Sequence, residues 1–424
     1  MNRQHRLQMA QRPSASSTEF KKTLQSWKRS TRYHGYGEAT AYGEMLETWL
    51  TEVSVEVQSV DPATALALYE QFIELDSHWF EHADDSGGAI GMAMQAACGH
   101  WLRAAAECRL TPDQAATKLM ALFQADHYGG REDLLRKAHL LLPESGLRAL
   151  VTRFESQMDQ VAPALKSGGP KATEVFKVSA ALTLLSEALH DPDIKVRAVL
   201  SYSPEPNALQ MESFVQAYLD AGKPREAMTW LQKNWGHMEG ARQSLMAAAL
   251  EDQGLWDQSQ PIRKQLFESC PSVAALQAWL RSTPEADQPS VLSLAKDVAQ
   301  SAQDVAAGVS ILLELKDVPA AETLVIQRFA ELDGQNYGML LNLADAFEAH
   351  GRHAPETLIY RALLVAILER GYAKAYGHGA QYLLRLRALA PWITQWDPLQ
   401  ESHAEFEAIL RQKHGRKTSF WSRV

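Results

Sequence analysis

Helix pairs joined at a small residue recur in the second half of this 424-residue chain at intervals of about 32–34 residues. The chain turns at Gly222, again 32 residues later at Gly254, then near Asp317, and 34 residues after that at Gly351. The stretch "STPEADQP" (282–289) lies midway in the longer gap, which therefore spans two units. This recurrence is typical of tetratricopeptide-type repeats, although no unit carries the full set of consensus residues. The pattern predicts an all-α fold, a tetratricopeptide-like α-solenoid of stacked antiparallel helix pairs.

The first half of the chain shows the same helical spacing and no strand signals. Residues 61–83 are expected to form one helix, with Asp61 as its cap and Pro62 in its first turn. The clearest boundary is the Gly/Pro stretch "LKSGGPKAT" at 165–173. The expected organisation is a disordered basic tail over 1–17, an N-terminal helical region over 18–163, the tetratricopeptide-like array over 170–414 and a basic C-terminal tail over 415–424.

The stretch "HWFEH" (78–82) matches the H-x-x-E-H pattern of the inverzincin metalloproteases. Both histidines are expected on the polar face of the 61–83 helix, away from its apolar stripe. A zinc peptidase also needs a cleft and a third protein ligand, and a pattern with two free positions is a weak signal. We therefore interpret this stretch as a solvated helix face and expect no metal, no cofactor and no catalytic residue. A metal-dependent hydrolase at HWFEH stays a minor alternative.

The formal charge of -9 is unevenly distributed. Residues 1–32 carry a net +7 and residues 411–424 a net +5, which leaves -21 for the residues between them. Basic ends of this kind can bind nucleic acid, with Trp27, Phe420 and Trp421 as rings on which bases could stack. They can equally fold back onto the acidic body or stay solvated. The candidate basic contacts at the C-terminal end are Lys413, Arg416, Lys417 and Trp421.

Composition favours a cytoplasmic protein. The chain is 46% hydrophobic and has no apolar run long enough to span a bilayer, so we expect no membrane partner. The N-terminal segment has positive charge but no apolar stretch of a secretory signal. The three cysteines form no C-x-x-C pair, and reduced thiols in the cytoplasm are the simplest interpretation.

Five segments in chain order carry a family resemblance. They are "RYHGYGEATAY" (32–42), "FIELDSHWFEHADDSGGAIG" (72–91), "DHYGGREDLL" (126–135), "YLDAGKPREAMTW" (218–230) and "ILRQKHGRKTSFW" (409–421). Together they resemble an uncharacterised bacterial helical family whose members often follow a SWIM-type zinc finger in longer proteins. The zinc ligands of a SWIM finger are not present in this sequence. The resemblance implies a tetratricopeptide-like fold and no established activity.

Three polar, glycine-containing segments are expected to converge. If the first four helices alternate in direction, the segments 31–37, 84–88 and 126–130 lie at the same end of the stack. Loops on a rigid scaffold often carry function, so a polar patch there is one hypothesis. The alternative is that the same side chains satisfy helix ends and one another. The patch residues are Arg32, Tyr33, His34, Tyr36, Asp84, Asp85, Asp126 and Tyr128.

These features favour a non-enzymatic interaction scaffold. A helical superhelix offers a long surface for a protein or peptide partner, and the acidic body favours a basic one. The alternative is a nucleic-acid-associated protein that uses its basic ends, for which steep salt dependence of binding would be the signature.

Overall fold

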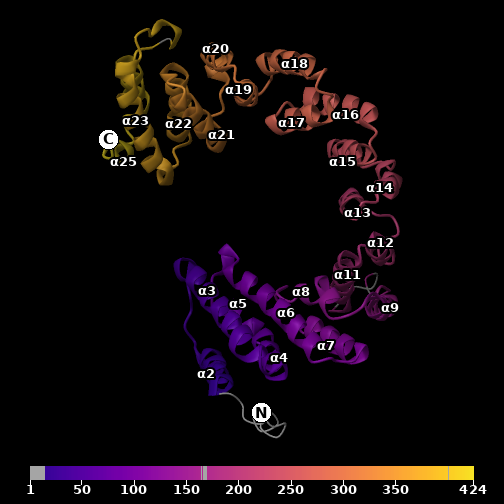
Figure 1. Ribbon diagram of the computed structural model, residues 1–424. Helices are drawn as coiled ribbons and strands as arrows, with labels where there is room; N and C mark the ends of the chain where they lie inside the picture. Colours follow the sequence, from indigo (N-terminus) through magenta and orange to yellow (C-terminus); the bar gives the residue numbers. More distant parts are fainter. Residues whose placement is uncertain (1–14, 164, 166–169, 400) are drawn as a thin grey trace, which may run out of the picture. The chain divides into compact units, whose positions relative to one another are not determined.

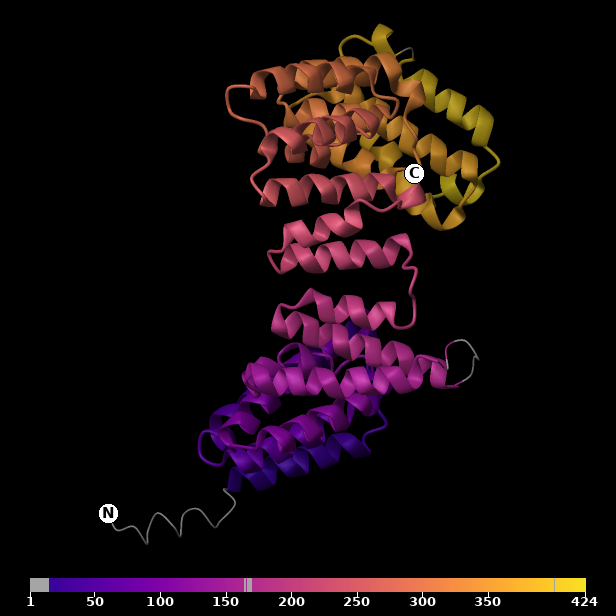
Figure 2. The same cartoon turned by 90° about the vertical axis from the view of Figure 1, so that its right-hand side faces the viewer.

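The computed structural model describes residues 15–163, 165, 170–399 and 401–424, which form helices joined by short loops (Figures 1 and 2). Within these ranges there is no strand, and an isolated β-bridge pairs His34 with Ala83. No described helix combines the length and the apolar character needed to cross a membrane. The all-α prediction is confirmed.

The chain divides into two compact units, the first ending at Trp235 and the second beginning at Gly236. The first unit contains α2 (Ala15–Arg29), α3 (Tyr36–Glu52), the π-helix η1 (Val53–Gln58), α4 (Pro62–Ile73), α5 (Asp76–Glu81), η2 (Asp85–Gly87), α6 (Ala89–Glu107), α7 (Pro112–Gln124), α8 (Asp133–Arg136), η3 (Ala138–Leu140), α9 (Glu144–Val161), α11 (Pro170–Leu189), α12 (Pro192–Leu200), α13 (Ala208–Asp220) and α14 (Pro224–Leu231). The second contains η4 (Gly236–Met238), α15 (Glu239–Asp252), α16 (Trp256–Ser269), α17 (Val273–Ser282), α18 (Gln288–Ser301), α19 (Val305–Glu314), α20 (Val318–Arg328), η5 (Phe329–Glu331), α21 (Tyr337–Ala349), α22 (His353–Arg370), η6 (Ala373–Ala375), α23 (Tyr376–Leu389), η7 (Ala390–Trp392), η8 (Asp397–Leu399), α24 (His403–His414) and α25 (Thr418–Trp421).

The Gly/Pro stretch at 165–173 lies inside the first unit. Helix α9 ends before this stretch and α11 begins within it, at Pro170, and the two helices pack against each other. Residues 166–169 of the stretch, and residues 1–14 of the basic tail expected over 1–17, lie outside the described residues. Residue 15 already belongs to α2, so the first helix begins before the expected end of that tail.

Left-handed residues mark the turns between paired helices. Gly222, Gly254 and Gly351 have φ of 67°, 74° and 64°, which confirms the turns predicted there. The turn predicted near Asp317 takes its left-handed residue one position earlier, at Lys316, and His190 marks a further turn between α11 and α12. At each turn the next N–H donates to the carbonyl five residues back, as in a Schellman motif. These 2.8–2.9 Å bonds join Asp191 to Ser186, Lys223 to Tyr218, Leu255 to Leu250, Asp317 to Leu312, and Arg352 to Phe347.

The helix expected over 61–83 is broken near Glu74. Its start is as predicted, since Asp61 accepts a 3.1 Å hydrogen bond from the Thr64 N–H. Helix α4 ends at Ile73, however, and α5 begins at Asp76. The Trp79 indole N–H donates across this break to the Phe72 carbonyl at 2.9 Å. The break therefore leaves no orphaned carbonyl at Phe72 and redirects the chain after α4.

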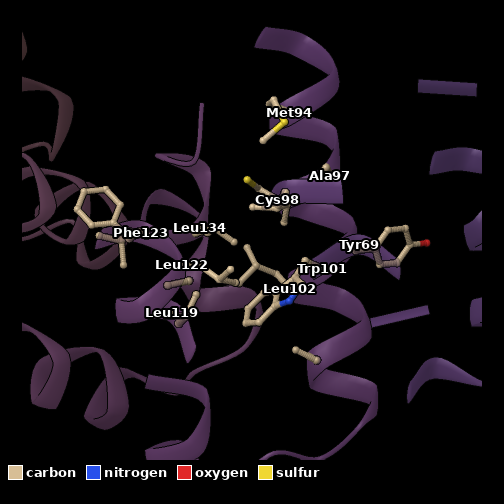
Figure 3. Close-up of a cluster of buried hydrophobic side chains, with 14 of the residues drawn as sticks. Tyr69, Met94, Ala97, Cys98, Trp101, Leu102, Leu119, Leu122, Phe123 and Leu134 are labelled. Carbon is tan, nitrogen blue, oxygen red and sulfur yellow. The ribbon is translucent and has the colours of Figure 1, made fainter. Parts of the chain in front are cut away.

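Helix α6 supplies much of the core of the first unit. Its side chains Cys98, Trp101 and Leu102 are fully buried, and Figure 3 shows them beside Leu119 and Leu122 of α7. Burial of apolar surface on this scale is the main stabilising contribution to such a unit. Helix α6 thereby holds in place the two loops, before it and after α7, that contribute to the candidate site.

Candidate functional site

Two of the three predicted loops are joined by backbone hydrogen bonds. The His34 N–H donates to the His82 carbonyl at 2.8 Å, and the Asp84 N–H donates to the His34 carbonyl at 2.9 Å. The third loop reaches the same place through Tyr128, whose hydroxyl donates to Glu81 Oε1 at 2.8 Å. The structure therefore brings the segments 31–37, 84–88 and 126–130 together at one end of the first unit.

The loop surface, as we call the exposed part of these segments, carries three tyrosines. Tyr33, Tyr36 and Tyr128 are 59%, 70% and 44% exposed. The Tyr128 ring also stacks on Phe80, with centroids 5.3 Å apart. Large aromatic rings this exposed are a common feature of contact surfaces.

The three aspartates of the predicted patch are helix-end and turn ligands. Asp84 Oδ1 accepts from the Ser86 N–H at 3.2 Å and the Ser86 hydroxyl at 2.5 Å. Asp85 caps the first turn of α6, accepting from the N–H groups of Ile90 at 2.7 Å and Gly91 at 3.0 Å. The hydroxyl and backbone bonds from Ser86 also lower the pKa of the Asp84 carboxyl. These carboxylates fix the loop between α5 and α6.

Asp126 has the same role in the loop after α7. The residue is 9% exposed, and its carboxylate accepts from the N–H groups of Tyr128, Gly129 and Arg131 at 2.9–3.0 Å. Lys177 of α11 donates to the Asp126 carbonyl at 2.7 Å. The carboxylate thus serves backbone N–H groups and the carbonyl serves Lys177, which supports the alternative in which the patch aspartates stabilise the fold.

A buried ion pair beneath the loop surface was not predicted from the sequence. The Arg131 guanidinium bonds Asp76 through Nε at 3.0 Å and through Nη2 at 2.9 Å, and Nη1 donates to the Leu122 carbonyl at 3.0 Å. Asp76 opens α5, the helix before the 84–88 loop, and Arg131 follows the 126–130 loop, so the pair connects the elements that carry these two loops. Both residues lie in segments that carry the family resemblance, but no sequence pattern linked them.

Arg32 and His34 complete the first loop. Arg32 Nη2 lies 3.1 Å from Glu38 Oε2 in an exposed ion pair. The His34 ring stacks on Tyr42, with centroids 3.9 Å apart and planes 8° apart. Burial, reinforced by the neighbouring Arg32 charge, lowers the pKa of His34. A neutral, stacked His34 therefore belongs to the packing of α3 more than to a reactive surface.

The histidines of HWFEH are half-buried and not the solvated face that the sequence predicts. The rings of His78 and His82 lie 4.2 Å apart, and His82 Nδ1 is 2.9 Å from the His78 carbonyl oxygen. Burial and the adjacent His82 lower the pKa of His78. The glutamate of the motif, Glu81, accepts from Tyr128 instead of facing a water position between the histidines. In the part of the chain that the structure describes, no three His, Cys, Asp or Glu side chains are grouped to hold a metal ion.

A family comparison matches residues 1–423 to a family of unknown function, DUF6880. The chain belongs to this family. No curated protein and no solved structure matches it. Family membership over the whole chain accounts for the spread of the resembling segments, and it assigns no activity to the loop surface.

The aromatic residues near the basic ends of this DUF6880 chain are part of its fold. Trp27 packs edge-on against Trp49 and Trp79 at centroid distances of 5.8 and 5.9 Å. Phe420 is fully buried in the core of the second unit, so residues 415–424 are folded and not a free tail. These positions differ from the exposed rings expected from the sequence for base stacking.

The candidate contacts at the C-terminal end include packed side chains and exposed ones. The Trp421 indole N–H donates to the His414 carbonyl at 2.9 Å, and the Arg411 guanidinium covers its ring at 4.2 Å. Lys413 and Arg416 are exposed, and Lys417 is half-buried. Of these candidate contacts, the structure therefore leaves two cations, Lys413 and Arg416, on the solvent side, while Trp421 of α25 is held against α24.

Proposed function

We propose that this protein is a non-enzymatic interaction scaffold that binds a basic protein or peptide segment on the loop surface of its first unit. The observation that carries the proposal is the exposure of Tyr33, Tyr36 and Tyr128 on loops that are each fixed from beneath. Tyrosine gives a large contact area at low cost in conformational entropy. Loops that are already held in one conformation lose little further conformational entropy on binding.

The helical architecture supports the same proposal. Stacked helix pairs with repeated left-handed turns are the building unit of tetratricopeptide-like α-solenoids, whose surfaces bind peptides. We propose that the paired helices of this chain belong to that class. The net -21 between residues 33 and 410 favours a partner rich in Lys and Arg, which would associate faster at low ionic strength.

A cytoplasmic location is part of the proposal. Cys98, Cys108 and Cys270 are unpaired in the structure, and Cys98 is buried in the core of the first unit. Unpaired thiols in a folded protein fit a reducing compartment.

Selection from a displayed random peptide library tests the proposed function. The full chain is compared with the triple variant Tyr33→Ser, Tyr36→Ser, Tyr128→Ser, and the matched control is Tyr337→Ser, a 67% exposed tyrosine of the second unit. We expect Lys/Arg-rich peptides from the full chain and the control and at least about tenfold weaker binding of those peptides to the triple variant. Peptides that bind the triple variant equally well would remove the loop surface from the proposal.

A further inference from the structure

A cavity of about 650 Å³ lies within the second unit. It is bounded by η5 and the segment after it, by α22, and by Leu399, Glu401 and Phe406. Its apolar lining includes Leu332, Val365, Leu399 and Phe406. A cavity of this size and lining can bury a small organic molecule.

Arg361 of α22 is the buried cation of this cavity. The residue is 6% exposed, and its guanidinium donates from Nη1 to the Leu399 carbonyl at 3.3 Å and from Nη2 to the Glu401 carbonyl at 2.9 Å. Arginine has five N–H donors, so these bonds use two of them. Arg361 Nε is buried and has no hydrogen-bond partner among the described residues.

No described carboxylate forms an ion pair with Arg361, in contrast to the other buried arginine, Arg131. The guanidinium lies over the rings of Phe406 at 4.5 Å and Trp396 at 5.6 Å, which compensates part of the burial of its charge. Burial lowers the pKa of Arg361 even though Glu401 acts in the opposite direction. A buried guanidinium without an ion-pair partner is costly, and its contacts among the described residues are two carbonyls and two ring faces.

The same face of α22 carries a second unsatisfied group. Thr357 is 1% exposed, and its hydroxyl is without a hydrogen-bond partner among the described residues. Thr357 precedes Arg361 by one helical turn, so the two side chains lie on one face of the helix. Thr357 does not line the cavity, so the unsatisfied group that bears on a ligand there is Arg361 Nε.

We propose that this cavity binds a small monocarboxylate with an apolar body, whose carboxylate accepts hydrogen bonds from Arg361. The planar fork of arginine matches a carboxylate, and the apolar lining matches the remainder of such a ligand. This inference does not depend on the proposed function, because it concerns a different unit and a different class of ligand.

The charges around the cavity distinguish a monocarboxylate from a phosphate. Arg370 also lines the cavity, but so do the acids Asp333, Glu369 and Glu401. With two cations against three carboxylates, a doubly charged anion is repelled more strongly than a singly charged one. Inorganic phosphate also has no apolar part that could pack against the apolar lining.

Calorimetric titration of the full chain tests the proposal with hexanoate, its neutral analogue hexanamide and inorganic phosphate. We expect hexanoate to bind at least about tenfold more tightly than hexanamide, because only the carboxylate forms charge-assisted hydrogen bonds. Phosphate is expected to bind more weakly than hexanoate. Equal affinities for hexanoate and hexanamide, tighter binding of phosphate, or no binding of hexanoate up to about 10 mM overturns the proposal.

Substitution locates the site. Arg361→Met keeps an unbranched apolar stem and removes the guanidinium and its charge, and we expect it to abolish the preference for hexanoate over hexanamide. The control is Arg281→Met, which makes the same change at an exposed arginine of α17 and is expected to leave that preference intact. If Arg361→Met fails to fold, hydrogen exchange of the wild-type chain decides. Protection by hexanoate confined to α22 and residues 401–406 supports the site, and protection elsewhere contradicts it.

Discussion

Arg131 Nη2 lies 2.9 Å from Asp76 Oδ1, with 3% and 2% of the two side chains exposed. The pair joins the start of α5 to the segment after α7, 55 residues further along the chain. Since the same guanidinium also binds the Leu122 carbonyl, it holds three parts of the first unit together.

Removal of one partner of this pair should be strongly destabilising. We expect Asp76→Ala to lower the free energy of unfolding by about 3–5 kcal/mol, because it leaves a buried guanidinium without its counterion. Urea unfolding measures the change. The control Arg153→Ala breaks the exposed pair with Asp113 and should cost no more than about 1 kcal/mol. The double variant Asp76→Leu, Arg131→Met should recover much of the loss, and a double variant as unstable as Asp76→Ala alone would contradict the assignment.

The sequence predicted the elements that depend on local signals. The turns at Gly222, Gly254 and Gly351 follow from glycine's freedom at positive φ, and Asp61 caps a helix as the sequence Asp61-Pro62 indicates. Convergence of the three loops followed from the alternating direction of consecutive helices, which needs only the order of the elements.

What the sequence could not predict depends on contacts between distant residues. Nothing near Asp76 indicates that it pairs with Arg131, and the helical spacing continues through the break after Ile73. The burial of Phe420 is likewise a tertiary effect, since the surrounding basic residues are typical of a solvated tail. The sequence does not distinguish Arg361 from the exposed arginines of other helices. Its burial and its lack of an ion-pair partner among the described residues are visible only in the structure.

Lys316 occupies a turn position that glycine fills in three of its counterparts. Its φ is 60° and its side chain is exposed, so the backbone carries strain and no contact is lost on truncation. We expect Lys316→Gly to raise the free energy of unfolding by about 0.5–1 kcal/mol. Gly254→Ala is the reverse change at an equivalent turn and should lower it by a similar amount. Thermal unfolding of the two variants in parallel checks the prediction, which fails if both variants shift in the same direction.

Gly308 lies where two helices approach closely. A Cβ at this position would lie 2.3 Å from the Ala299 carbonyl oxygen and 3.2 Å from a Leu324 methyl. Gly308→Ala is therefore expected to force α18 and α19 apart at a cost of about 1–3 kcal/mol. Gly338→Ala is the control, because a Cβ there meets nothing within 4 Å and alanine favours the helix. Equal effects of the two substitutions on urea unfolding would show that the close approach does not matter.

His100 should make stability depend on pH. Burial, with a contribution from Arg103, lowers the pKa of His100 to about 4, and its Nδ1 is buried without a partner among the described residues. The unfolded chain binds a proton near the ordinary value of 6.5, so stability is full above that pH and falls as the pH drops from 6.5 towards 4. His100→Leu should lower the number of protons taken up on unfolding by up to one between pH 6.5 and pH 4, and stability should then depend less on pH. Urea midpoints between pH 7 and 4 measure the slope, and an unchanged slope in the variant would contradict the assignment.

Phe420 decides whether the basic C-terminal end is a tail or a structural element. Its ring is fully buried, edge-on to Tyr376 at 5.8 Å, and it closes the end of α23. A free tail would tolerate any substitution here, whereas the structure predicts that Phe420→Ala lowers the free energy of unfolding by about 3–5 kcal/mol. Trp392→Ala is the matched control, because this tryptophan of the same unit is 70% exposed and its removal should cost about 0.5 kcal/mol or less. If both variants unfold like the wild type, residues 415–424 do not pack on the rest of the second unit. The basic end would then be a tail that could contact nucleic acid through Lys413 and Arg416.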